Sequence, residues 1–300
     1  MTLALYSPSY WDVVVDVEPA ALAGGKGKHP APSTVVVGGF AWNAARVLAA
    51  AGRAGLRVVT VVPTDEDARV RAAAPAGVAL DAIAAPPGWL PITVVLDPGG
   101  ACRILRDPGA ALDGAWRWDA VSAAARAAAV HVLGRVPAGF AAAALAAARA
   151  AGARIAWCGG AGLPVDALAG FDVACVNAAE AATLLGATAT ATTTAEAAQA
   201  LAERATGADA VRVVTGGARQ PTVAAARRGA AIELHAVEPA PLAPGAIVTL
   251  LGAGDAFAAA LVATACLTDG GAPRAALDVV AGLRAGQRAA ARLITGGRDG

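Results

Sequence analysis

Two glycines and a carboxylate late in the chain have the types and spacing of a site that handles phosphate. The stretch LLGAGDAF covers residues 250–257, and an alanine-rich run of high helical propensity follows it. A helix that begins here would present unpaired N–H groups and the positive end of its dipole. Gly252, Ala253 and Gly254 would let those N–H groups surround an anion. Asp255 stands at the same rim, where it could take a proton from a hydroxyl that attacks the phosphate.

Two other interpretations of this stretch stay open from the residues alone. Asp255 could simply cap the helix, with the glycines forming a tight turn. The order G-A-G-D-A-F also resembles a dinucleotide-binding G-x-G-x-x-G, which would favour a nucleotide-dependent oxidoreductase. However, Phe257 takes the place of the third glycine, and little chain follows for a βαβ unit. No Walker A sequence is present, because GGKGK lacks the spacing and the following Ser or Thr.

Asn177 and Glu180 form a second candidate, three residues apart at the expected start of a helix. This spacing places both side chains on one face of a first helical turn. Glu180 could hold Mg²⁺ through water, the kind of site that this strongly hydrated ion favours. The pair also fits a capping box, with Asn177 as the cap. The two interpretations are compatible.

A third group of candidates lies near the N-terminus. Gly38 and Gly39 predict a turn from a strand into a helix that contains Asn43. Asp12 could accept hydrogen bonds from two sugar hydroxyls, or it could be an ordinary acid at a strand end. Two tryptophans neighbour these positions, Trp11 and Trp42. Either could stack on a substrate ring, although burial in a core is the more frequent fate of tryptophan.

The elements that must position these residues alternate along the chain. β-Branched runs predict strands at 56–62, 129–133, 153–157, 172–176 and 211–215. Alanine-rich runs between them predict helices at 41–52, 138–152, 177–186 and 194–207. This alternation favours an α/β fold, a three-layer, doubly wound and mainly parallel sheet with helices on both faces.

Two segments interrupt the alternation, at approximately 12–37 and 91–107. Both are rich in strand-forming residues and lack a helical pattern, and the second has the form of a hairpin joined by PGGA. They predict a small β lid over a cleft. No linker or internal repeat divides the chain, so residues 1–300 are expected to form a single domain.

Composition narrows the class of protein. Hydrophobic residues make up 57% of the chain and charged residues 16%, which favours a large core over disorder. The formal net charge is +1 without a basic stripe, so neither nucleic acid nor a membrane surface is an expected partner. The four cysteines lack C-x-x-C spacing, and the three histidines lie too far apart for a His-based metal site. With no basic leader and no long apolar span, a cytoplasmic protein is expected.

Together the motifs resemble the ribokinase family, the PfkB-type carbohydrate kinases, over nearly the whole chain. The family's C-terminal signature is approximately D-T-x-G-A-G-D-x-F, and residues 252–255 with Phe257 match its second half. Its Gly-Gly pair followed by Asn matches VGGFAWN at 37–43, and its N-x-x-E element matches residues 177–180. VVTGG at 213–217 follows a strand, as does the family's nucleotide-binding turn.

The resemblance implies an ATP-dependent kinase for a hydroxymethyl group of a sugar, sugar phosphate or nucleoside. It makes Asp255 the general base, with the anion hole at Gly252, Ala253 and Gly254. It assigns the acceptor to Asp12, Gly38, Gly39 and Asn43. It assigns ATP to Asn177, Thr215 and Gly217, with Mg²⁺ held by Glu180 through water. It also allows a homodimer formed through the lid.

The sequence departs from the family pattern at several positions. Thr249 replaces the first signature Asp, and Leu250 and Leu251 replace the usual Thr pair, so an activating monovalent cation is not expected. Cys158 stands where many relatives carry an Asp. These departures keep an alternative open: a catalytically degenerate kinase-fold protein that binds a sugar or nucleotide without turnover.

Overall fold

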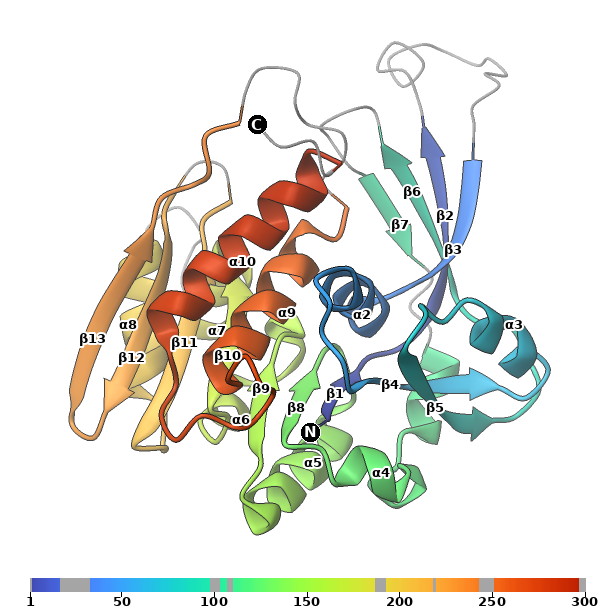
Figure 1. Cartoon of the computed structure of the whole chain (residues 1–300), viewed down its shortest axis with the longest axis horizontal. Helices are drawn as coiled ribbons and strands as arrows, with labels where there is room; N and C mark the ends of the chain where they lie inside the picture. Colours follow the sequence, from blue (N-terminus) through green and yellow to red (C-terminus); the bar gives the residue numbers. More distant parts are fainter. Residues whose placement is uncertain are drawn as a thin grey trace.

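A large sheet carries the strand ends at which the site residues were predicted (Figure 1). The computed structural model describes residues 2–16, 33–97, 103–106, 110–186, 193–217, 220–242 and 251–296. Within them, a nine-stranded sheet has the spatial order β13 (Ala231–Val237), β12 (Thr222–Arg228), β11 (Asp209–Thr215), β10 (Val173–Asn177), β9 (Arg154–Trp157), β8 (Val130–Leu133), β1 (Leu3–Tyr6), β4 (Leu56–Pro63) and β5 (Val78–Ala85). The strands from β11 to β5 run parallel, whereas β12 and β13 add antiparallel pairs.

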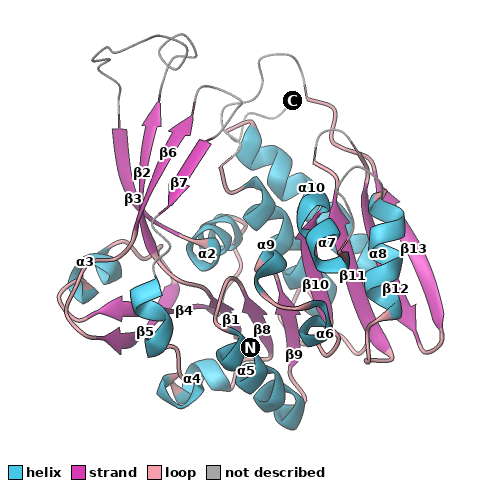
Figure 2. Cartoon of the chain, turned by 180° about the vertical axis from the view of Figure 1, so that it is seen from behind, coloured by secondary structure: helices cyan, strands magenta, loops and turns pink. Residues whose placement is uncertain are grey.

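Helices cover both faces of this sheet (Figures 1 and 2). In β1, Leu3 and Leu5 belong to one core cluster and Tyr6 to another, because successive side chains of a strand point to opposite faces. On the Leu3 face lie α2 (Phe40–Ala50), α3 (Asp67–Ala72), α9 (Ala253–Cys266) and α10 (Val279–Ile294). On the other lie α4 (Ala123–Arg126), α5 (Ala138–Ala151), α6 (Val165–Leu168), α7 (Ala178–Leu185) and α8 (Thr194–Glu203). Strands buried on both faces explain the uninterrupted apolar runs of the sequence.

A second, four-stranded sheet stands away from the large one, at the upper right of Figure 1. We call it the lid sheet, and its order is β3 (Ser33–Gly38), β2 (Tyr10–Asp16), β6 (Ile92–Asp97) and β7 (Arg103–Arg106). β2 pairs with β6 in parallel, and the two outer pairs are antiparallel. Short 3₁₀ helices at Ala110–Ala115, Trp118–Ala120 and Gly160–Gly162 complete the described elements.

The predicted α/β architecture and the separate small sheet are confirmed. The five predicted strands correspond to β4, β8, β9, β10 and β11, and the four predicted helices to α2, α5, α7 and α8. The hairpin expected near 91–107 is the β6–β7 pair. Residues 17–32, 98–102 and 107 of the predicted lid segments lie outside the described residues.

The strand pattern missed four strands of the large sheet, β1, β5, β12 and β13. β5 (VALDAIAA) and β12 (TVAAARR) are rich in alanine, which is depleted in strands, so their neighbours in the sheet decide their conformation. Among the described helices, none has both the length and the apolarity to cross a membrane.

Candidate active site

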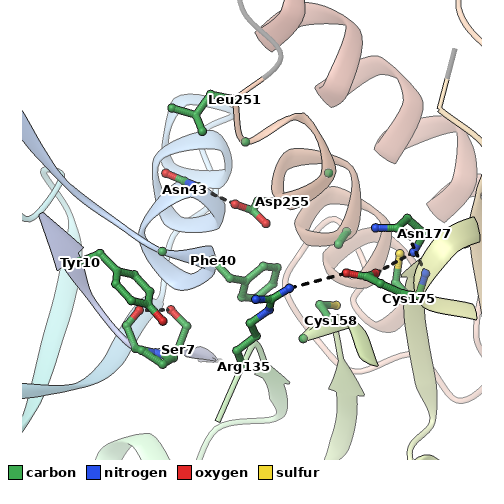
Figure 3. Close-up of a pocket in the computed structure, with 18 of the residues that line it drawn as sticks. Ser7, Tyr10, Phe40, Asn43, Arg135, Cys158, Cys175, Asn177, Leu251 and Asp255 are labelled. Carbon is green, nitrogen blue, oxygen red and sulfur yellow. Dashed lines mark hydrogen bonds and ion pairs between the residues drawn. The ribbon is translucent and has the colours of Figure 1, made fainter. Parts of the chain in front are cut away.

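A cavity of about 300 Å³ opens between the lid sheet and the carboxyl ends of the parallel strands (Figure 3). Most of the predicted site residues line it: Asp12, Gly39, Asn43, Asn177, Glu180, Thr215, Gly252, Gly254 and Asp255. Gly38, Gly217 and Ala253 are not among the lining residues. Residues from both ends of the chain meet here because parallel strands all finish at the same edge of the sheet.

α9 begins where the glycine pair predicted a helix start. Gly252 is its N-cap, and its φ of 76° lies in the left-handed region that favours glycine. The N–H of Ala256 donates to the carbonyl oxygen of Gly252 at 2.8 Å, which closes the first turn. Ala253 and Gly254 are the first residues of that turn, where N–H groups have no partner inside the helix. The first turn of α9 therefore has the local form of an anion-binding helix end.

Asn43 orients the carboxylate of Asp255. Its Nδ2 donates to Asp255 Oδ2 at 2.8 Å, across 212 positions of sequence. Asn43 is itself fixed by Arg46, which donates to Asn43 Oδ1 at 3.2 Å and to the carbonyl oxygen of Val37 at 2.5 Å. Burial lowers the pKa of the Arg46 guanidinium, and the charge of Asp12 opposes this shift. Asn43 is therefore half-buried and tied to both the start of α9 and the end of β3.

The glycine pair before α2 makes room for Asp12. A Cβ on Gly38 would lie 1.6 Å from Asp12 Oδ2, so only glycine allows the carboxylate to occupy its position. Gly39 has a φ of 106°, and a Cβ there would lie 2.4 Å from the carbonyl oxygen of Pro8. Asp12 lies after β1, within β2 of the lid sheet, and it is buried. Gly38 therefore leaves space for the Asp12 carboxylate without lining the cavity itself, while Gly39 borders the cavity.

The second motif forms a capping box and also borders the cavity. Glu180 N donates to Asn177 Oδ1, and Asn177 N donates to Glu180 Oε2, both at 2.9 Å. The other oxygen of the carboxylate, Oε1, lies 4.0 Å from Nη2 of Arg135. Asn177 is the register partner of Thr215 in β11, so two of the predicted nucleotide contacts end neighbouring strands. Both interpretations of the motif are compatible with this geometry.

Glu180 is the residue at which the sequence predicted a water-mediated magnesium site, and its carboxylate borders the cavity. Within the described part of the chain, no group of three or more His, Cys, Asp or Glu side chains could enclose a metal ion. Mg²⁺ does not need such a cage, because it keeps several waters and binds through one or two carboxylates together with substrate phosphates. A single carboxylate on the rim of the cavity fits that mode of binding. Thr249, which bears on the monovalent cation, lies outside the described residues.

Cys158 follows β9 and lines the cavity in place of the Asp of many relatives. Burial raises the pKa of its thiol well above the usual range, and Cys175 and Asp255 add to the increase. Burial also raises the pKa of the Cys175 thiol to about 12. Both thiols are therefore neutral at physiological pH, so Cys158 cannot replace a carboxylate as an anion.

The two tryptophans pack within the protein instead of bordering the cavity. Trp42 is fully buried, and its Nε1 donates to Ser9 Oγ at 2.6 Å. Trp11 donates to Glu66 Oε2 at 3.2 Å, and the guanidinium of Arg69 lies 4.6 Å from the centre of its ring. The stacking role considered for them is wrong, because neither ring lines the cavity.

Sequence reasoning missed several side chains that the structure brings to the site. Tyr10 and Thr93 line the cavity from the lid sheet, and Arg135 lines it from the loop after β8. Arg46 had a signal in the sequence, since it lies three residues after Asn43 and shares a helix face with it. Arg135 also had one, because it lies two residues after a predicted strand, at the edge where ligands bind in parallel sheets. Tyr10 and Thr93 had none, because their pairing across the lid sheet is long-range.

The dinucleotide interpretation of the glycine pattern is wrong. Within the described residues, α10 is the element that follows α9, and neither helix leads into another strand of the large sheet. The βαβ unit that the fingerprint requires is therefore missing around residues 252–257.

Comparisons with known proteins agree with this architecture. The family model described as "pfkB family carbohydrate kinase" matches residues 4–297. Similar solved structures include an adenosine kinase from Anopheles gambiae, with 18% identity, a TM-score of 0.75 and coverage of 100% of this chain and 96% of that one. A ribokinase from Thermotoga maritima has 17% identity, a TM-score of 0.71 and coverage of 98% and 93%. An adenosine kinase from Schistosoma mansoni in complex with 2-fluoroadenosine has 16% identity and a TM-score of 0.70, with coverage of 99% of this chain and 96% of that one. A search of curated proteins found no match.

Proposed function

The chain belongs to the pfkB family of carbohydrate kinases, and on this premise we propose that it transfers the terminal phosphate of ATP to a hydroxymethyl group of a sugar, sugar phosphate or nucleoside. One observation carries the proposal. The carboxylate of Asp255, oriented by Asn43, stands in the first turn of α9 and lines the same cavity as Gly252 and Gly254. A base and an anion-binding helix end thus share one rim, as phosphoryl transfer requires.

The acceptor is assigned to the lid side of the cavity. Asp12 is 5% exposed and reaches the cavity from β2. Because its carboxylate is largely shielded from water, it would form strong hydrogen bonds with acceptor hydroxyls. Gly39 and Asn43, from the start of α2, border the same space. Closure of the lid sheet over the acceptor would exclude water, which otherwise competes as the phosphate acceptor.

The nucleotide is assigned to the opposite side. Asn177 and Thr215 end neighbouring strands, and Gly217 lies in the turn after β11. ATP bound along these strand ends would direct its terminal phosphate toward the start of α9. Mg²⁺ bound near Glu180 would neutralise part of the charge on the phosphates.

The proposed chemistry is a direct displacement. Asp255 accepts the proton of the acceptor hydroxyl as its oxygen forms a bond to the terminal phosphorus. The bond from that phosphorus to the bridging oxygen breaks, and ADP leaves. The N–H groups of Ala253 and Gly254 face the developing negative charge, where fixed donors stabilise it without reorganisation.

We extend the proposal to the assembly, with one catalytic domain per chain and two chains pairing through their lid sheets. On the lid face opposite the cavity, one register row crosses four strands: Val35, Val13, Val94 and Leu105. Val35 is 56% exposed and Leu105 is 64% exposed, which is unusual for two apolar side chains in one row. Light scattering should give the mass of a dimer, and Leu105→Lys should shift it toward the monomer.

The proposed activity is tested by incubation with Mg²⁺, ATP and a panel of sugars, sugar phosphates and nucleosides, with ADP as the readout. Acceptor-dependent ADP formation supports the kinase. Binding of nucleotide or acceptor without ADP formation, at any Mg²⁺ concentration, would instead support the degenerate kinase-fold protein. A crystal with the terminal phosphate of a nucleotide far from residues 252–255 would overturn the assigned geometry.

A further inference from the structure

Arg135 carries the single positive charge among the described residues that line the cavity. Asp12, Glu180 and Asp255 each have a role in the proposed function, whereas Arg135 has none. Its backbone is well fixed just after β8, because Gly134 N donates to the carbonyl oxygen of Tyr6 at 2.7 Å. A charged side chain on a rigid loop at the ligand-binding edge of a parallel sheet is well placed for recognition.

The guanidinium of Arg135 is available to a ligand. Its side chain is 62% exposed, and its ion pair with Glu180 spans 4.0 Å. Such an exposed pair is weak and exchanges readily for a better partner. Figure 3 shows the side chain below Phe40, with the guanidinium directed across the cavity. Binding of a metal ion near Glu180 would weaken this pair further.

Arg135 stands at the junction of two hollows. A second cavity of about 550 Å³ shares Pro8, Tyr10, Arg135 and Glu180 with the first. Asp255 and Thr215 line the first cavity and not the second. The second hollow therefore adjoins the first at Tyr10 of the lid sheet, the side assigned to the acceptor, and at Glu180. Arg135 lines this junction, so an acceptor that reaches from Asp255 into the second hollow would lie beside the guanidinium.

We propose that Arg135 determines specificity by binding an anionic group on the acceptor, a phosphate or a carboxylate, while the hydroxymethyl group faces Asp255. This inference rests on the proposed function and narrows its acceptors to acidic ones, such as sugar phosphates and sugar acids. The planar guanidinium binds both kinds of anion through two parallel hydrogen bonds. A neutral sugar would leave it with the weak Glu180 pair alone. Asp113, which also lines the second hollow, disfavours anions on that side, so the anionic group is expected close to Arg135 itself.

The test compares matched acceptors with the full-length protein and three variants. The panel pairs fructose with its 1- and 6-phosphates and glucose with gluconate, each of which keeps a free hydroxymethyl group, so that its arms separate phosphate from carboxylate. Arg135→Gln should raise the KM of the preferred anionic acceptor on the order of 100-fold and change that of its neutral partner less than about threefold. Arg135→Lys keeps the charge and should recover part of the loss. Arg117→Gln, at an exposed arginine outside both cavities, is the control.

Calorimetric titration of the same acceptors without ATP gives a second readout that does not need turnover. Loss of anion binding in Arg135→Gln, with no phosphorylation of any acceptor, would support this inference and contradict the proposed function. Phosphorylation with no preference for anionic acceptors, or no effect of Arg135→Gln on them, would overturn the inference and leave the kinase intact. An increase in the KM of ATP with every acceptor would also overturn it, because Arg135 would then bind the nucleotide. So would a panel in which no anionic member binds or reacts.

Discussion

The two edges of the large sheet use charge in opposite ways. At the amino edge, Asp172 is 4% exposed and accepts hydrogen bonds from Arg149 at 3.0 Å, Arg154 at 3.3 Å and the N–H of Ile155 at 2.8 Å. Arg154 also pairs with Asp209, which pairs in turn with Arg228. The charges at this edge are neutralised by the chain's own side chains.

At the carboxyl edge the charges face a cavity. Asp12, Glu180 and Asp255 come from three different elements and line one space with Arg135. Helices that follow the parallel strands begin at this edge, where their dipoles favour anions, and a basic residue in the last turn of such a helix reaches the amino edge. Arg149 in the last turn of α5 is an example. The comparison teaches that one edge pairs its charged side chains with one another, while the other places its charged side chains around a cavity.

Asp255→Asn, at the carboxyl edge, should have the largest effect on turnover. If Asp255 is the base, turnover should fall about 100- to 10,000-fold, because asparagine cannot accept the proton. The free energy of unfolding and the Kd of ATP should change little. Steady-state kinetics, denaturant titration and calorimetry measure the three quantities. The exposed Asp119→Asn is the matched control, and near-normal turnover in Asp255→Asn would remove the residue from the role of base.

Asp172→Ala, at the amino edge, should lower the free energy of unfolding and leave turnover unchanged. It removes the carboxylate shared by two arginines, and breaking a buried ion pair costs about 3 kcal/mol of unfolding free energy. The midpoint of urea denaturation should fall accordingly, while kcat per folded molecule should be preserved. Asp67→Ala removes an exposed i,i+4 partner of Arg71 and should cost less than about 0.5 kcal/mol. Similar losses from both substitutions would contradict the proposed contrast between the edges.

His131, the second residue of β8, adds a pH-dependent contribution to the same sheet. Its Nδ1 lies 2.9 Å from the Tyr6 hydroxyl, and burial lowers its pKa from 6.5 to about 4. Between these pH values the unfolded chain binds a proton that the folded chain does not. Stability should therefore fall as the pH drops from about 6.5 to about 4, by up to about 3 kcal/mol, and this contribution should level off below that range.

Thermal unfolding across this pH range measures the effect. His131→Gln should flatten the profile, even if it lowers stability at neutral pH. His235→Gln, at a histidine on the exposed strand β13, should keep the slope. An unchanged slope in His131→Gln would assign the pH dependence to other groups.

Arg46→Gln should have the smallest effect, a roughly tenfold loss of kcat. It removes the guanidinium that fixes the Asn43 amide, so the hydrogen bond to Asp255 becomes less well oriented. Because Arg46 acts through Asn43, the rate should fall while the KM of ATP stays constant. Arg46→Lys should recover part of the rate. Equal loss of stability and rate would instead indicate that Arg46 mainly supports the packing of α2.

The sequence predicted the helix starts that carry the candidate motifs better than it predicted the pairing of the strands. The motif around Asp255 and the pair Asn177–Glu180 are local, so spacing alone placed them at helix starts, where the structure has them. The partner strands of Asp12 were not predicted, because the lid sheet is built from long-range pairing that no local pattern specifies. The same reason explains why Tyr10, Thr93 and the strands β5 and β12 were missed.

By itself the sequence determined which residues could do chemistry and which elements would carry them, because helix starts, glycine turns and alternating runs are local properties of the chain. Tertiary structure alone decided that Asn43 reaches Asp255 across 212 positions, that Gly38 makes room for Asp12, and that Arg135 faces the same cavity. These contacts depend on the order and register of parallel strands, which align their carboxyl ends at one edge regardless of their distance in sequence.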